Sequence, residues 1–233
     1  MSLYDPFAAV YDQWAADMTE DVPFYIGLAK EADGPIVELA VGNGRVAVPV
    51  ALETGRRVIG VDASLAMLAQ ARVRAEQTGA DLDLRRQDMR DFAVDEPAAL
   101  VYCPFRSLLH LPTLADKRRV FERGAASLRP GGRFAWNAFC FNHSIAASLD
   151  GTRQDQNGVE HELRFVPADN RIDITADLPG GPHTISLWWA TRSEWEGLID
   201  VSGLEVEALY GWFDRRPFDD EAREFVYVAR KPR

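Results

Sequence analysis

The chain opens with a helical pattern and then settles into an alternation of strand-like and helix-like segments. Between Phe7 and Trp14, apolar side chains recur at steps of three and four residues, which predicts a helix. A break at residues 33–35 ends this region, and short apolar runs then alternate with amphipathic stretches as far as Phe141. The predicted strands are residues 35–41, 57–61, 82–84, 98–103 and 133–139, and the predicted helices are residues 45–54, 64–75 and 113–128. Pro49 implies that the first of these helices begins late or bends.

This alternation predicts a parallel β-sheet with helices on both faces, which is an α/β fold. After Phe141 the alternation stops. Turn residues at 169–170 and 179–181 separate three consecutive predicted strands, which indicates an antiparallel meander inserted after the fifth strand. The predicted segments after Phe141 are strands 160–166, 171–178 and 183–189, a helix over 191–201, and strands 204–212 and 224–230.

Charge and composition narrow the classes of function without naming one. The 233 residues include 26 Lys and Arg against 36 Asp and Glu, so the net charge is −10. This surplus of acids argues against nucleic acid as a partner, because affinity for the phosphate backbone comes from Lys and Arg. No run of about 18 apolar residues predicts a membrane span, and the first twelve residues lack the features of a secretory signal. Two lone cysteines, Cys103 and Cys140, fit a cytoplasmic protein, and no cluster has the spacing of a metal site.

The most informative stretch is the junction between the first predicted strand and the next helix. Gly42 and Gly44 let the backbone pass close to a ligand, and the helix that follows directs its free N–H groups toward it. With Ala47 they fit the pattern of a dinucleotide-binding loop. Asp62 ends the second predicted strand, where a carboxylate binds the hydroxyls of a ribose. NAD, FAD and S-adenosylmethionine all carry that ribose, so the loop alone leaves the cofactor open.

Two further acids distinguish these cofactors. Glu38 lies inside the first strand, where a carboxylate is costly unless it meets backbone amides or a cation. Asp88 and Met89 end the third strand, which puts another acid at the same edge of the sheet. There Asp88 is placed to accept a hydrogen bond from an adenine amino group while Met89 packs on the ring.

With these features the sequence resembles the class I S-adenosylmethionine-dependent methyltransferases, over roughly residues 4–141 and the last two strands. The motifs that carry the resemblance are Tyr11-Asp12-Gln13-Trp14-Ala15, residues 38–45, Gly60-Val61-Asp62-Ala63-Ser64 with Met67-Leu68, Asp88-Met89-Arg90-Asp91-Phe92, and residues 128–133. The resemblance implies a three-layer, doubly wound, mostly parallel sheet of seven strands whose last strand is antiparallel, with the small antiparallel β insertion added after strand five.

The resemblance also implies S-adenosylmethionine as the cofactor and gives roles by position. Gly42 and Gly44 would approach its methionine part, Asp62 its ribose, and Asp88 with Met89 its adenine. The cofactor-binding residues implied in this way are Tyr11, Glu38, Ala40, Gly42, Gly44, Arg45, Asp62, Ala63, Asp88, Met89 and Cys103, the last near the sulfonium. Ala40 departs from the pattern, since many relatives have glycine there. Because alanine holds positive φ poorly, the backbone at Ala40 is expected in the ordinary β region.

Aromatic residues and Arg45 near the cofactor each have two interpretations. Tyr4, Tyr11 and Trp14 fit a lid whose rings stabilise the sulfonium, but the helical spacing of Trp14 fits plain core packing equally well. Arg45 is placed either to pair with the methionine carboxylate or to remain solvated.

His110, just past the fourth strand, is the candidate general base. The alternative is a structural histidine, and His143, after the fifth strand, is the rival candidate. Methyl transfer from a sulfonium is an in-line displacement that needs mainly alignment and exclusion of water. A base is required only where the acceptor arrives protonated.

The chain is predicted to divide into an N-terminal helical lid (residues 1–34), a methyltransferase core (35–141 and 190–233) and an antiparallel β insertion (142–189). The insertion is expected to lie over the cofactor's methyl end and to shape the acceptor site. The predicted substrate-binding residues are Phe105, Arg106, His143, Arg164 and Trp188. Trp188 and Trp189 are adjacent on a strand and point to opposite faces, so only one of them can face the site. Sheet packing is the alternative for both.

The sequence therefore predicts a methyltransferase acting on an N or O atom of a small molecule. An NAD-type oxidoreductase is the first alternative, but the Tyr-x-x-x-Lys pair of short-chain dehydrogenases occurs only at residues 227–231, on the last predicted strand rather than on a helix. The second alternative is a non-catalytic binding module on the same fold. The identity of the acceptor and the oligomeric state are not predicted.

Overall fold

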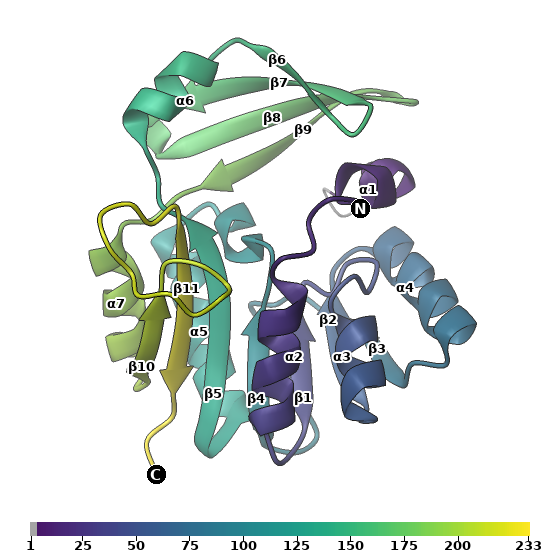
Figure 1. Cartoon of the computed structure of the whole chain (residues 1–233), viewed down its shortest axis with the longest axis vertical. Helices are drawn as coiled ribbons and strands as arrows, with labels where there is room; N and C mark the ends of the chain where they lie inside the picture. Colours follow the sequence, from purple (N-terminus) through teal and green to yellow (C-terminus); the bar gives the residue numbers. More distant parts are fainter. Residues whose placement is uncertain (1–3) are drawn as a thin grey trace.

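The computed structural model describes residues 4–233 and contains two β-sheets (Figure 1). The larger sheet has seven strands in the order β10-β11-β5-β4-β1-β2-β3. Its strands are β1 (Ile36–Leu39), β2 (Val58–Asp62), β3 (Leu82–Arg86), β4 (Ala98–Cys103), β5 (Leu128–Phe139), β10 (Glu205–Tyr210) and β11 (Glu224–Arg230). β11 runs antiparallel to both of its neighbours, and the strands from β5 to β3 are parallel. The predicted mostly parallel sheet with an antiparallel last strand is confirmed.

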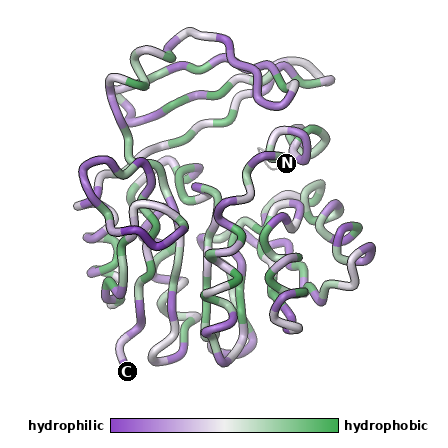
Figure 2. The backbone as a smooth tube through the Cα atoms, in the orientation of Figure 1, coloured by the Kyte–Doolittle hydropathy of each residue, from purple (hydrophilic) through white to green (hydrophobic). Residues whose placement is uncertain are grey.

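Helices cover both faces of this sheet, because side chains alternate along each strand and both faces are apolar. On one face α2, α3 and α4 pack around Ile36, Val58 and Leu100, and on the other α5 and α7 pack around Val37 and Trp136. These helices are α2 (Val22–Glu31), α3 (Ala47–Thr54), α4 (Leu65–Thr78), α5 (Leu114–Ser127) and α7 (Arg192–Val201). Figure 2 shows hydrophobic residues gathered in the central strands, whereas the loop before β11 is mostly hydrophilic.

Local sequence signals place the starts of α4 and α5 where they were predicted. Ser64 accepts a hydrogen bond from the Met67 N–H and begins α4, and Thr113 caps α5 in the same way. Helix α3 begins late, at Ala47, so Pro49 falls in its first turn, where a proline is tolerated. β5 begins earlier than predicted, at Leu128, because the turn around Gly131 is accommodated by a register shift against β4.

The second sheet has four antiparallel strands in the order β6-β7-β8-β9 and lies above one end of the large sheet (Figure 1). Its strands are β6 (Arg153–Gln156), β7 (Val159–Val166), β8 (Arg171–Leu178) and β9 (Gly181–Trp188). The predicted meander corresponds to the last three strands. β6 and the preceding helix α6 (His143–Leu149) were not predicted, because β6 reads Arg-Gln-Asp-Gln and α6 buries no residue. β6 carries no apolar residue, and α6 is too short for its Ile145 and Leu149 to define a helical stripe.

The N-terminal helix α1 (Ala8–Trp14) lies between the two sheets. Phe7 and Trp14 pack against Val159 and Ile185 of the second sheet and also belong to the cluster that contains Met67 of α4. The apolar stripe that predicted this helix is therefore buried on two sides. Over residues 4–233, no helix has the length and apolar character that a membrane span requires.

Candidate active site

A cavity of about 340 Å³ opens where the carboxyl ends of β1, β2, β3 and β4 meet. Ligands of open α/β sheets bind at this edge. The residues that line the cavity are Tyr4, Tyr11, Ala40, Gly42, Val61, Asp62, Ala63, Met67, Gln87, Asp88, Met89, Arg90, Phe105, Ser107, His110 and Leu111. The sheet supplies its base, and the N-terminal segment supplies the two tyrosines.

The loop after β1 takes its shape from three residues in the left-handed region. Gly42 has φ +54° and Gly44 has φ +80°, and a Cβ on Gly44 would lie 3.3 Å from Val48 Cγ2. Ala40 also has φ +54°, so the expectation of an ordinary β conformation there was wrong. The chain turns out of the strand at Ala40, since Val41 already bonds to the Val61 carbonyl of β2. Tertiary pairing thus overrides the preference of alanine.

This strain predicts that Ala40→Gly leaves the protein as stable or raises its free energy of unfolding by up to about 1 kcal/mol. Alanine in the left-handed region costs about 1–2 kcal/mol, and the extra chain entropy of glycine offsets about 0.5–1 kcal/mol of the relief. Urea denaturation measures the change. Ala69→Gly, at an exposed position within α4, is the matched control and should lower the free energy of unfolding by about 1 kcal/mol. An equal loss in both variants would contradict strain at Ala40.

Asp62 is fixed by the loop that it faces. Its Oδ2 accepts the Gly42 N–H at 2.9 Å, and its Oδ1 accepts the Ser64 N–H at 2.7 Å. Burial raises the pKa of Asp62 above its usual range, and these amide hydrogen bonds oppose the rise. The carboxylate lines the cavity and keeps lone pairs free there, which suits the two hydroxyls of a ribose.

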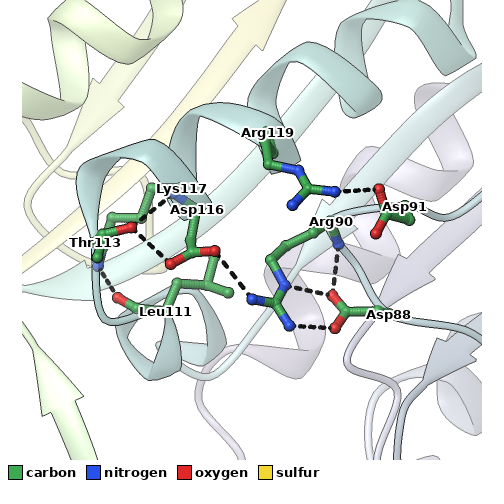
Figure 3. A network of polar contacts seen from close by, with 8 residues as sticks. All are labelled: Asp88, Arg90, Asp91, Leu111, Thr113, Asp116, Lys117 and Arg119. Atoms are coloured by element: carbon green, nitrogen blue, oxygen red, sulfur yellow. Dashed lines mark hydrogen bonds and ion pairs between the residues drawn. The ribbon is translucent and has the colours of Figure 1, made fainter.

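Asp88 belongs to a network of ion pairs that runs to the start of α5 (Figure 3). Its two oxygens accept hydrogen bonds from Arg90, at 2.6 Å and 3.0 Å, and Arg90 donates to Asp116 at 3.0 Å. Asp116 also accepts the hydroxyl of Thr113, the residue that caps α5. The hydrogen bonds from Arg90 hold the pKa of Asp88 below its usual range. Asp88 is therefore an ionised acceptor held in a fixed orientation beside Met89.

Glu38 lies behind the cavity rather than in its wall. It is 1% exposed, and its Oε2 accepts the hydroxyl of Tyr102 on β4 at 2.6 Å. Burial raises its pKa to about 8, although the tyrosine hydrogen bond opposes this. A cation or backbone amides were expected as partners, but the structure provides a tyrosine. Of the three acids, Asp62 and Asp88 share the cavity and Glu38 supports it from below.

His110 lines the cavity with a defined tautomer. Its Nδ1 lies 3.1 Å from the Ser186 carbonyl oxygen, which can only accept, so Nδ1 carries the proton. Its Nε2 therefore accepts the hydroxyl of Tyr4 at 2.6 Å. Burial lowers the pKa of His110 to about 4, so the ring is neutral near pH 7. His110 is a positioned hydrogen-bond acceptor for whatever displaces Tyr4.

Comparisons with known proteins agree with this geometry. Residues 36–132 match the profile of a family described as a methyltransferase domain. A dTDP-3-amino-3,6-dideoxy-alpha-D-glucopyranose N,N-dimethyltransferase from Streptomyces fradiae is 29% identical over 192 residues, which are 76% of this chain and 72% of that protein.

Two solved structures share the whole fold. The CcbJ methyltransferase from Streptomyces caelestis superposes with a TM-score of 0.85 at 24% identity, covering 100% of this chain and 99% of its own. An S-adenosylmethionine-dependent methyltransferase from Clostridium acetobutylicum gives 0.82 at 17% identity, with both chains fully covered. Residues 36–132 are therefore a methyltransferase domain, and the whole chain has the fold of an S-adenosylmethionine-dependent methyltransferase. S-adenosylmethionine is therefore its cofactor, and the acidic pair of Asp62 and Asp88 across one cavity fits the ribose and adenine of that molecule.

Arg45 of this methyltransferase has partners of its own. Its guanidinium binds Asp21 through two hydrogen bonds of 2.6 Å, also donates to the Met18 carbonyl, and lies 4.7 Å from the centre of the Phe105 ring. The side chain is neither solvated nor part of the cavity wall. Arg45 instead ties the N-terminal segment to the helix after the glycine loop.

The N-terminal segment closes one side of the cofactor cavity. Tyr4 and Tyr11 line it, whereas Trp14 packs on His161 with ring centres 4.7 Å apart and is 8% exposed. Of the two interpretations of Trp14, core packing is the one observed. Asp12 accepts a hydrogen bond of 2.5 Å from Asn43, so the segment is attached to the glycine loop beside the cavity.

The residues after β4 divide between the cavity and the core. Phe105 lines the cavity, and Arg106 turns away to bind Glu224 of β11, with Nη2 and Oε2 2.9 Å apart. Cys103 is fully buried behind the cavity, and burial raises the pKa of its thiol. Cys103 and Cys140 are free thiols, as expected.

Three predicted substrate-binding residues lie away from the cavity. On β7 and β9, the side chains of His161 and Ile185 pack toward α1. Because side chains alternate between the two faces of a strand, Arg164 and Trp188, three residues further along, face outward. On that outer face the Arg171 guanidinium lies 5.9 Å from the Trp188 ring centre. His143 is exposed at the start of α6. The choice of Trp188 over Trp189 was a choice of face that the sequence alone does not fix.

Several residues of the cavity wall were not predicted. They flank predicted positions in the sequence, and that adjacency is the signal that could have identified them. They are Val61 and Met67 around Asp62, Gln87 and Arg90 around Asp88, and Ser107 and Leu111 around His110.

Proposed function

We propose that this methyltransferase acts on a nitrogen or oxygen atom of a small molecule that reaches the cavity beside His110. The observation that carries the proposal is the position of His110, which joins the cofactor cavity to β9 of the insertion sheet through Ser186. The relative from Streptomyces fradiae modifies an amino sugar, which favours an amine among the acceptors.

The bound cofactor supplies a methyl group on a good leaving group, so the chain needs only to align the acceptor and exclude water. Tyr4 and Tyr11 cover the cavity, and their rings shield it from solvent. An acceptor that displaces the Tyr4 hydroxyl meets the lone pair of His110 Nε2. The Nδ1–H to Ser186 hydrogen bond keeps that lone pair directed into the cavity. His110 thus orients an N–H or O–H group of the acceptor. With a hydroxyl acceptor it also receives the proton, because that proton becomes more acidic than an imidazolium of pKa about 4 as the methyl group leaves the sulfonium and bonds to oxygen.

The test is a screen with methyl-labelled S-adenosylmethionine across amines, phenols and carboxylates. We expect transfer to at least one amine or hydroxyl compound by the wild-type protein. Tight binding of S-adenosylhomocysteine without transfer to any class would instead support a non-catalytic module, and stabilisation by NADH alone would support an oxidoreductase.

On the acceptor found in this way, His110→Ala should lower kcat by about tenfold or more, because one oriented hydrogen bond and proton acceptor is lost. S-adenosylhomocysteine affinity, measured by calorimetry, should stay within about threefold. Since the pKa of His110 is about 4, its titration should cause no rise or fall of the wild-type kcat between pH 5 and 8.

His143→Ala is the matched control, because that histidine is exposed and outside the cavity. It should leave kcat unchanged. A large loss in His143→Ala with full activity in His110→Ala would reverse the assignment.

A further inference from the structure

A second cavity, of about 140 Å³, lies next to the cofactor cavity and shares Phe105 with it as a lining residue. Phe105 lines both cavities, so its ring is a wall that they share. The second cavity is built from the α1–α2 connection, the turn after β4, the strands β5 and β11, and the loop after β10. Its lining residues are Met18, Glu20, Asp21, Phe105, Arg106, Asn137, Trp212, Phe213 and Glu224.

The floor of this cavity is a fixed polar network. Glu224 is 1% exposed and accepts hydrogen bonds from Asn137 at 2.6 Å and from Arg106 at 2.9 Å. Asn137 in turn accepts the hydroxyl of Tyr25 at 3.1 Å. Phe105 and Arg106 both have positive φ, +58° and +61°, a costly conformation that this network and the packing maintain. The floor is therefore rigid and already satisfied by its own partners.

The balance of charge around the cavity is negative. Three carboxylates line it, on Glu20, Asp21 and Glu224. Two guanidinium groups neutralise two of them, because Arg45 binds Asp21 and Arg106 binds Glu224. No hydrogen bond or ion pair within residues 4–233 engages Glu20, so one negative charge remains at the rim.

Two aromatic rings also line the second cavity. Trp212 and Phe213 are half-buried, with ring centres 5.3 Å apart at 62°. The face of an aromatic ring attracts a cation, and a tryptophan does so most strongly. A free carboxylate and two aromatic rings that line one cavity are the groups that recognise an organic ammonium ion. An anionic ligand would meet the unpaired Glu20 and find Arg106 already bound.

We propose that this second cavity binds an ammonium-bearing part of the methyl acceptor. The inference rests on the proposed function, and it names the chemical class of the substrate. Glu20 forms the ion pair, and Trp212 with Phe213 packs on the alkyl or aryl group next to the ammonium. Phe105 sets the spacing between that group and the cofactor cavity.

The experiment compares three compounds of one shape, benzylammonium, benzyl alcohol and benzoate, by NMR titration of the protein saturated with S-adenosylhomocysteine. We expect the ammonium compound to bind most tightly to the wild-type protein. Glu20→Gln should weaken it about threefold, as an exposed ion pair does, and should leave benzyl alcohol unaffected. Trp212→Leu should weaken it about threefold to tenfold.

Glu162→Gln, an exposed position on the outward face of the insertion sheet, is the matched control and should change none of the three affinities. Absence of benzylammonium binding, tighter binding of benzoate, or an unchanged affinity in Glu20→Gln would each overturn the proposal. Affinity for S-adenosylhomocysteine is measured on the same samples. A wild-type protein that does not bind S-adenosylhomocysteine would count against the proposed function. A wild-type protein that binds S-adenosylhomocysteine but does not prefer the ammonium compound would count against the second cavity alone.

Discussion

Asp62→Ala is expected to weaken binding of S-adenosylhomocysteine about 100-fold. The carboxylate offers charged acceptors to the two ribose hydroxyls, and each hydrogen bond to a charged group contributes about 1.5–3 kcal/mol. Water partly replaces the two lost hydrogen bonds, so the net loss of binding free energy is about 3 kcal/mol. Each 1.4 kcal/mol corresponds to a tenfold change in affinity. The substitution also removes the acceptor of the Gly42 N–H, so the glycine loop loses one of its two hydrogen bonds to β2.

Isothermal titration calorimetry of the purified variants measures this loss, and thermal unfolding checks that the fold is retained. Asp81→Ala is the matched control, since Asp81 is an exposed aspartate that pairs with Arg57 at the far end of the strands. Its affinity for S-adenosylhomocysteine should equal that of the wild-type protein. An Asp62→Ala protein that binds within threefold of the wild type would remove Asp62 from the cofactor site.

Glu38→Gln is expected to make the protein more stable than the wild type at pH 8 and equally stable near pH 5. The pKa of Glu38 is about 8 in the folded chain, against about 4.3 in an unfolded one. Between these values the folded chain holds a proton that the unfolded chain has released, so stability falls as pH rises. At about 1.36 kcal/mol per pH unit, the wild type loses about 3–4 kcal/mol from this group between pH 5 and 8.

Glutamine has the shape of the protonated acid and still accepts the Tyr102 hydroxyl, so the variant escapes this loss. Urea denaturation at pH 5, 6.5 and 8 gives the difference between the two proteins, in which the opposite contribution of His110 cancels. Glu53→Gln, at an exposed position paired with Lys30, should show no such divergence. Parallel curves for Glu38→Gln and the wild type would mean that Glu38 is ionised in the folded protein.

The cavity at the sheet edge was largely predictable because many of its residues lie at the ends of strands. In a parallel sheet the carboxyl ends of neighbouring strands share one edge, so Asp62 and Asp88 had to lie near the glycine loop once the order of the strands was set. The N-terminal caps of α4 and α5 were equally predictable, because they depend on neighbouring residues only. The side chains of Ser64 and Thr113 accept hydrogen bonds from the backbone N–H groups three residues later.

The errors have a common cause, which is that each depended on a partner far away in the sequence. Ala40 takes positive φ because β2 pairs with the residue after it. Arg45 is bound by Asp21, 24 residues earlier, and so leaves the cavity wall. Arg164 and Trp188 face outward because α1 covers the other side of their sheet.

The sequence by itself determined the layered α/β fold and the acids and glycines at the sheet edge, because strand periodicity and turn chemistry act over a few residues. Only the tertiary structure decided which face of the insertion turns toward the core, that Tyr4 is hydrogen-bonded to His110, and that Glu20 and Trp212 line one cavity. These residues lie up to 192 positions apart in the sequence, counted from Glu20 to Trp212. Their geometry follows from how complete elements pack, and no local pattern encodes it.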